Sequence, residues 1–94
     1  MSDMDKLRAE LLKDPEYKEY YYEMQPAADI SKAIISARLA KKLTQKELSD
    51  LCGVTQSDIS RLESCSGSPS LKTIKKIAKA LNMRVKIEFV PVED

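Results

Sequence analysis

Two helix-start signals lie eleven residues apart in the middle of this chain, with a glycine between them. Thr44 precedes Glu47 by three positions, and Thr55 precedes Asp58 by the same spacing. A threonine hydroxyl at the N-cap accepts a hydrogen bond from a backbone N–H of the first turn, and an acidic side chain suits that helix end. Gly53 supplies the positive φ that a sharp helix end favours. The spacing therefore predicts two short helices joined by a tight turn, which is a helix-turn-helix.

The apolar residues of this central unit are few and regularly spaced. They recur three or four positions apart, which places them on one side of each short helix. The residues expected to form the core of the unit are Leu48, Leu51, Cys52, Val54, Ile59 and Leu62.

The other side of the second helix carries short or hydrogen-bonding side chains. These are Thr55, Gln56, Ser57, Ser60 and Arg61. The major groove of DNA presents donors and acceptors on its base edges, and bulky side chains would clash there. We therefore expect Gln56 to pair with adenine and Arg61 to bind guanine or a phosphate of double-stranded DNA. A solvated helical hairpin without a DNA function is the alternative.

Three more residues are expected to contact the phosphate backbone. Gln45 begins the first helix of the pair, which crosses the backbone in this arrangement. Ser70 and Lys72 lie near the start of the following helix. The other lysines of that helix are interpreted as its solvated face.

The rest of the chain is expected to be helical up to residue 82. Spacing and caps predict helices over 3–13, 15–25, 30–40 and 69–81. Pro26 is expected to end the second and Asp29 to cap the third, while Ser68 and Pro69 open the last as N-cap and first helical residue. The expected buried residues are Ile30, Ala33, Ile34, Ala37, Ala40, Leu71, Ile74, Ile77, Ala78 and Leu81.

Residues 83–89 differ, because apolar and charged side chains alternate there. A period of two predicts a half-buried strand, which Pro91 would end. No second strand is evident, so we expect the same strand of a second copy as its partner. The dimer contacts are then Val85, Ile87 and Phe89, and a two-fold dimer implies a palindromic operator. Pairing with a different protein and a frayed tail are the alternatives.

Charge divides the chain unevenly, although its net charge is only +1. Residues 1–30 hold four basic and eight acidic residues, whereas 31–86 hold twelve basic and four acidic ones. This asymmetry suggests two partners of opposite charge, with ordinary surface scatter as the alternative. The expected organisation is an acidic, tyrosine-containing helical arm over 1–26, a DNA-binding domain over 27–82, and a strand with a tail over 83–94.

Several function classes lack the residues that they need. The chain has no histidine and no CxxC spacing, which argues against zinc and against a cysteine nucleophile. Nothing supports an enzyme, a cofactor or a small-molecule ligand. No apolar run is long enough for a membrane helix, and the start lacks the core of a signal peptide. We therefore expect a cytoplasmic protein whose Cys52 and Cys65 are reduced.

The stretch from Arg38 to Leu81 resembles the Cro/C1-type (XRE) helix-turn-helix family. The matching residues are Arg38, Leu43 to Gln45, Glu47, Leu48, Gly53 to Ser57, Ile59 to Glu63, Pro69 to Leu71, Thr73, Ile77, Ala78 and Leu81. The resemblance implies an all-α, lambda-repressor-like helical bundle that binds DNA. Ser49 departs from the alanine usual in the family, and Cys65 lies in a longer loop than usual.

The arm carries a narrower resemblance. Residues 11–17 (LLKDPEY), the tyrosine helix that follows and the short apolar C-terminal segment resemble HigA-type antitoxins. Such a family would imply repression of a shared operon and neutralisation of a small basic, mRNA-cleaving toxin of the RelE/HigB class. The residues expected to bind the toxin are Leu7, Leu11, Tyr17, Tyr21 and Tyr22.

Tyrosine favours interfaces, and four tyrosines lie within six positions of the arm. Tyr17, Tyr20 and Tyr21 share a helix face, and packing on the chain's own core is their alternative role. Tyr22 points elsewhere and is the stronger interface candidate. Two function classes stay open: an antitoxin that binds both operator and toxin, and a stand-alone phage-type repressor for which the arm is needless.

Overall fold

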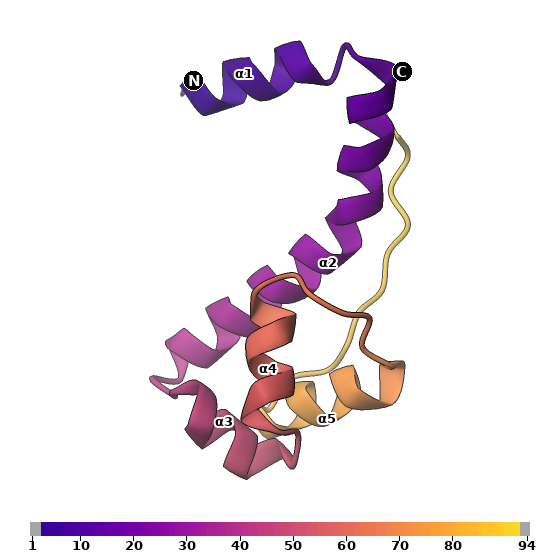
Figure 1. The fold of residues 1–94 in the computed structure, drawn as a ribbon. Coiled ribbons are helices and arrows are strands. Elements are labelled where there is room, and N and C mark those ends of the chain that lie inside the picture. The colour runs from indigo at the N-terminus through magenta and orange to yellow at the C-terminus, as the bar shows by residue number, and fades with distance from the viewer. Residues whose placement is uncertain (1–2, 93–94) are drawn as a thin grey trace.

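The computed structural model describes residues 3–92, so the first two residues of the expected arm and the last two of the expected tail lie outside the described part. All secondary structure in 3–92 is helical, which confirms the all-α class (Figure 1). The helices are α1 (Asp3–Leu11), α2 (Pro15–Ala40), α3 (Gln45–Cys52), α4 (Gln56–Glu63) and α5 (Leu71–Ala80). None of these helices is both long and apolar enough to cross a membrane.

Helix α2 is one continuous helix of 26 residues. It starts as predicted, because the Asp14 side chain accepts from the backbone N–H of Glu16 and Pro15 occupies the first turn. The predicted break was wrong: Pro26 lies inside the helix, and Asp29 is an exposed mid-helix residue rather than a cap. Proline leaves the Tyr22 carbonyl without its usual N–H partner, yet alanines and other good helix formers around it sustain the helix. Figure 1 shows the resulting bend.

The core lies where the second half of α2 meets the three short helices. Helices α2 and α3 both pack against α4, and α3 also packs against α5. The buried apolar side chains are Ile34, Ala37, Leu48, Val54, Ile59, Leu62, Ile77 and Leu81. Ile30 and Cys52 pack against them from the edge, as does Leu43. The predicted helix-turn-helix core is therefore confirmed in its main residues.

Some expected core residues are exposed instead. Leu51 is 60% exposed because Leu48 and Cys52, one turn apart, take the inner row of the eight-residue α3. Ala33, Ala40 and Leu71 are exposed as well, since they lie on the flanks of their helices.

The last helix also begins later than predicted. Ser70, not Ser68, is its N-cap, and its Oγ accepts from the backbone N–H of Thr73 at 3.1 Å. Ser68 and Pro69 precede the helix, in the loop that follows Gly67, whose φ is +84°. The backbone turns at Gly67, and the chain becomes helical only at Leu71.

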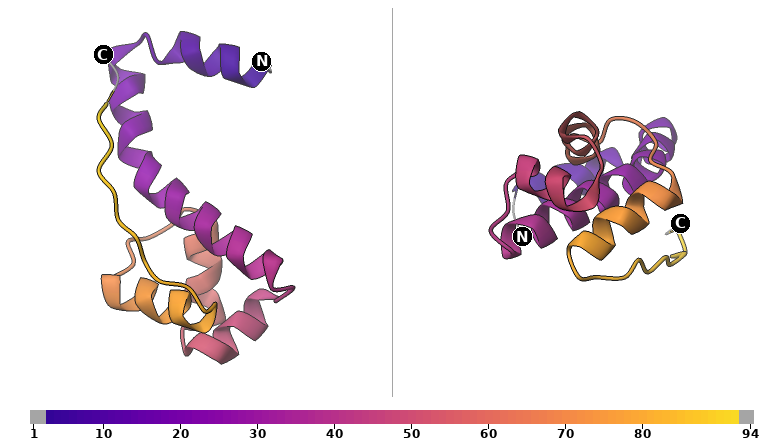
Figure 2. Two further views of the ribbon diagram at one scale, coloured as in Figure 1. Left: turned by 180° about the vertical axis from the view of Figure 1, so that it is seen from behind. Right: turned by 90° about the horizontal axis from the view of Figure 1, so that it is seen from below.

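The two ends of the chain lie apart from this core. Helix α1 buries none of its residues and lies across the far end of α2 (Figure 1). Residues 83–92 form an extended coil that runs alongside α2 towards its start (Figures 1 and 2). The predicted strand over 83–89 was wrong within this chain. A strand needs a backbone partner, and the rest of 3–92 is helix and short loops that offer none.

Candidate nucleic-acid interface

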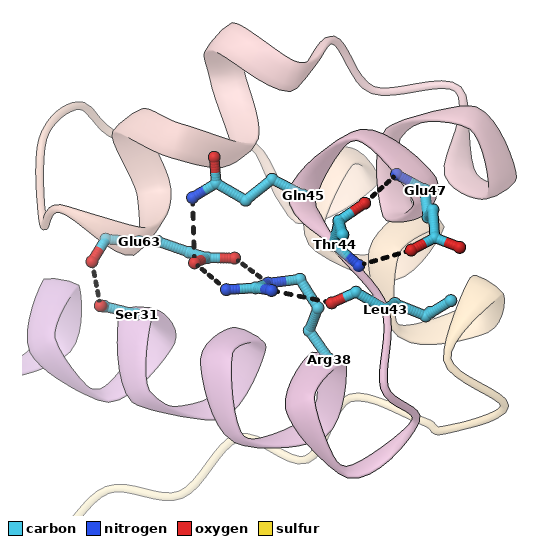
Figure 3. Close-up of polar contacts among 7 residues, drawn as sticks. All are labelled: Ser31, Arg38, Leu43, Thr44, Gln45, Glu47 and Glu63. Atoms are coloured by element: carbon cyan, nitrogen blue, oxygen red, sulfur yellow. Dashed lines mark hydrogen bonds and ion pairs between the residues drawn. The ribbon is translucent and has the colours of Figure 1, made fainter.

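Helix α3, the first helix of the pair, is fixed by hydrogen bonds at both of its ends. Thr44 Oγ1 accepts from the backbone N–H of Glu47, and the Glu47 carboxylate accepts from the backbone N–H of Thr44, both at 3.0 Å (Figure 3). The hydrogen bond from the Thr44 backbone N–H to the Glu47 carboxylate is the main cause that lowers the pKa of Glu47. Gly53 ends α3 at φ +74°, and its N–H donates to the Ser49 carbonyl at 2.9 Å. The predicted capping box and glycine turn are confirmed.

Helix α4 presents its polar side to solvent. Thr55 is its N-cap, and the hydroxyl accepts from the backbone N–H of Asp58 at 3.1 Å. The candidate base-reading residues Gln56, Ser57, Ser60 and Arg61 are all exposed. Within 3–92 the first three make no side-chain hydrogen bond, and Arg61 forms only a loose, exposed pair with Asp58 at 3.5 Å. Their donors and acceptors are therefore available to an external partner.

Gln45 is held by a buried ion pair that sequence reasoning missed. Arg38 Nε donates to Glu63 Oε2 at 2.8 Å, and Arg38 Nη2 donates to Glu63 Oε1 at 2.9 Å (Figure 3). The remaining Arg38 nitrogen donates to the Leu43 carbonyl at 2.8 Å. The Gln45 amide donates to Glu63 Oε1 at 3.2 Å. This cluster joins α2, the start of α3 and the end of α4.

The electrostatics of the cluster keep both charges in place. Burial alone would raise the pKa of Glu63, but hydrogen bonds from Arg38 and Gln45 and the charge of Arg38 lower it below its ordinary value. The hydrogen bond to Glu63 raises the pKa of Arg38. Ser31 on α2 adds a 2.6 Å hydrogen bond from its hydroxyl to the Glu63 backbone carbonyl. Both ends of Glu63 are thus tied to α2.

The expected phosphate contacts at the start of α5 divide between two places. Ser70 lines a small hollow of about 240 Å³ together with Arg61, Gly67 and Thr73. The hollow lies between the end of α4 and the start of α5, so it brings two candidate residues together. Lys72 is exposed and lines a different groove, on the side of α5 that faces the tail.

The other candidate residues lie away from α4. Leu7 and Leu11 are exposed on α1. Tyr17, Tyr21 and Tyr22 are half-buried in one cluster: Tyr17 stacks on Tyr21 with ring centroids 6.4 Å apart, and Tyr21 meets the edge of Tyr22 at 5.6 Å. The Arg8 guanidinium lies 6.0 Å from the centre of the Tyr21 ring, which links α1 to α2. On the tail, Val85 is half-buried, while Ile87 and Phe89 are exposed.

Comparison with known proteins adds three findings. The helix-turn-helix family model HTH_3 matches residues 34–86. The chain is 38% identical over 56 residues to an uncharacterized HTH-type transcriptional regulator of Sinorhizobium fredii; the match takes in 60% of this chain and 29% of that protein, so the chain spans less than a third of this relative's length. Among solved structures, it is similar to a chain of a toxin-antitoxin module from Streptococcus pneumoniae. That match has a TM-score of 0.65 and 33% identity, and it covers 98% of this chain and 96% of the other.

Proposed function

We propose that this chain, which belongs to the HTH_3 helix-turn-helix family, is a DNA-binding antitoxin that represses its own operon and neutralises a small basic, mRNA-cleaving toxin of the RelE/HigB class. The observation that carries the proposal is the likeness to a toxin-antitoxin module along nearly the whole chain, arm included. A helix-turn-helix alone would account for operator binding. The described part of the arm contributes no residue to the buried core, and toxin binding would give the arm a function.

The DNA-binding part of the proposal rests on α4. Its exposed polar side chains sit above the two buried residues Ile59 and Leu62, so the helix is presented rigidly. The proposed DNA contacts are Gln45, Thr55, Gln56, Ser57, Ser60, Arg61, Ser70 and Lys72. The twelve basic and four acidic residues of 31–86 favour approach to phosphates. Two copies acting on a palindromic operator complete the model.

The toxin-binding part rests on the arm. Helix α1 leaves Leu7 and Leu11 exposed, and Arg8 of the same helix contacts the tyrosine cluster on the first turns of α2. An apolar and aromatic patch among acidic residues suits a basic protein partner. The proposed toxin contacts are Leu7, Leu11, Tyr17, Tyr21 and Tyr22.

The experiment is a separation of the two activities in cells that express the neighbouring open reading frame. If that neighbour arrests growth, this chain should rescue it. Leu7→Glu is expected to abolish rescue but leave operator binding intact. Leu39→Glu is the matched control, because Leu39 is 59% exposed on α2 and Leu7 is 54% exposed on α1. Gln56→Ala is expected to show the opposite behaviour, with rescue intact and operator binding weakened.

A stand-alone repressor is the second candidate, and the Sinorhizobium fredii relative, named as a transcriptional regulator, favours it. If the chain is a stand-alone repressor, the neighbouring open reading frame should not arrest growth. Both Leu7→Glu and Leu39→Glu should then bind the operator normally. Growth arrest that this chain does not relieve would also contradict the antitoxin proposal.

A further inference from the structure

The tail carries a stretch of backbone that nothing in the described chain uses. The Met83 N–H donates to the Ala78 carbonyl at 2.8 Å, and beyond it no backbone hydrogen bond joins 84–92 to another described residue. Pro91 has no N–H to donate. Seven residues, 84–90, therefore lie between the last bonded amide and the proline with both edges open. Phe89 within them is 96% exposed.

We propose that two copies of the chain pair these segments as an antiparallel ribbon in one register, centred on Ile87. This inference rests on the homodimer of the proposed function and names its contacts. Ile87 is the middle residue of 84–90, so this register pairs the largest number of open backbone groups. It also places apolar residues opposite apolar ones, since residues directly opposite in an antiparallel pair share a face.

The charged residues select the same register. With Ile87 on the two-fold axis, Lys86 lies opposite Glu88 of the partner subunit, and the pair occurs twice by symmetry. Moving the axis to residue 86 would pair Arg84 with Glu88 of the partner subunit but would oppose two lysines at the axis itself. Moving it to residue 88 would oppose two glutamates. An axis at residue 85 would set Arg84 against Lys86 of the partner subunit. The register centred on Ile87 pairs opposite charges and avoids these like-charge contacts.

The register also accounts for an open apolar groove. Residues 83–88 of the tail, the charged ones included, line a groove of about 430 Å³ whose walls include Ile30 and Ala33 of α2 and Ile74 of α5. The ribbon sets Phe89 of the partner subunit directly opposite the half-buried Val85, on the ribbon face that Val85 and Ile87 share. The Phe89 side chain, which is exposed in the single chain, is thus covered in the dimer.

The test uses the free protein, without DNA or toxin, in sedimentation equilibrium. Lys86→Glu and Glu88→Lys each place like charges across the axis twice, and each is expected to weaken the homodimer about tenfold. An equimolar mixture of the two variants restores both opposite pairs in the heterodimer, so the mixture should dimerise with wild-type affinity. Arg84→Glu is the matched control: it makes the same charge change opposite the uncharged Val90 of the partner subunit and is expected to have little effect.

A second pair of variants tests the groove. Phe89→Ala is expected to weaken the homodimer more than Val90→Ala, whose side chain lies on the other face. A monomeric wild-type chain, single variants that dimerise like wild type, or a mixture that forms no preferred heterodimer would each overturn the register. These results are independent of growth rescue and operator selection, so a failed register and a failed antitoxin proposal give different patterns.

Discussion

Arg38 and Glu63 form an ion pair with two hydrogen bonds that ties α4, the helix with the candidate base-reading residues, to the long helix α2. The two side chains are only 13% and 7% exposed. The same glutamate holds Gln45 at the start of α3, so one carboxylate fixes three helices against each other. The geometry of the candidate DNA surface therefore depends on a contact beneath it.

Arg38→Met is expected to lower the free energy of unfolding by about 3 kcal/mol, because it leaves the Glu63 carboxylate buried without its cation. Urea unfolding followed by circular dichroism measures the loss. Lys46→Met is the control, since Lys46 and Asp50 are 4.0 Å apart and 74% and 71% exposed. Such a surface pair contributes less than about 1 kcal/mol. Equal losses in the two variants would mean that the buried Arg38–Glu63 pair contributes no more to the free energy of unfolding than an exposed pair does.

Glu63→Gln tests the pH dependence of the same contact. The pKa of Glu63 lies below its ordinary value of 4.5 in the folded chain, so the unfolded chain takes up the proton first as pH falls. The contribution of the carboxylate is therefore complete above about pH 4.5 and is lost as pH falls below it. We expect wild type to exceed Glu63→Gln in stability at neutral pH and the difference to narrow in acid. A difference that stays constant across urea titrations at each pH would contradict this.

Cys65 has a φ of +62°, in the left-handed region that glycine tolerates best. Cys65→Gly should be more stable than Cys65→Ala by about 1 kcal/mol, because only the glycine relieves the contact between Cβ and the backbone. Comparing these two variants removes the effect of losing the sulfur. Thermal unfolding is the measurement, and the prediction fails if the alanine variant melts at the same temperature or higher.

Pro26→Ala should raise the helix content and stabilise α2 by about 1–3 kcal/mol, because it restores the hydrogen bond to the Tyr22 carbonyl. Pro15→Ala is the matched control. Pro15 lies in the first turn, where its missing N–H costs nothing, so no gain is expected there. Far-UV circular dichroism during a thermal melt separates the two. A destabilised Pro26→Ala variant would mean that the bend itself is needed for packing.

Gln56→Ala should weaken binding to the specific operator by about 1–3 kcal/mol and relax its sequence preference. Gln25→Ala makes the same change on α2, away from α4, and should bind as wild type does. Fluorescence anisotropy with operator and scrambled duplexes gives both numbers. If the specific affinity of Gln56→Ala is unchanged, Gln56 does not read the bases.

The central part of the fold was predictable because its signals are local. Each N-cap and the helix that it starts lie within a few residues, and the Gly53 turn is specified by one residue type. Thr44, Gly53 and Thr55 accordingly have the predicted conformations. The core residues Leu48 and Ile59 followed from helical spacing alone.

The parts that sequence did not reveal depend on distant contacts. Arg38 and Glu63 are 25 residues apart, and no periodicity links an arginine to its carboxylate at that distance. Pro26 predicts a helix end because proline usually marks one, but the helix-forming residues on either side outweigh the cost of one lost hydrogen bond. The alternation over 83–89 is real, yet the chain holds no strand to pair with it.

The unbroken α2 has a mechanical consequence. At roughly 1.5 Å per residue its 26 residues extend about 39 Å along the bent helix axis. The arm lies at one end of α2 and the helix-turn-helix core packs against the other end, with no loop between them (Figure 1). A partner that binds the arm is therefore connected to the helix-turn-helix core through a single helix. In the proposed complex, the toxin and the operator would lie at opposite ends of that helix.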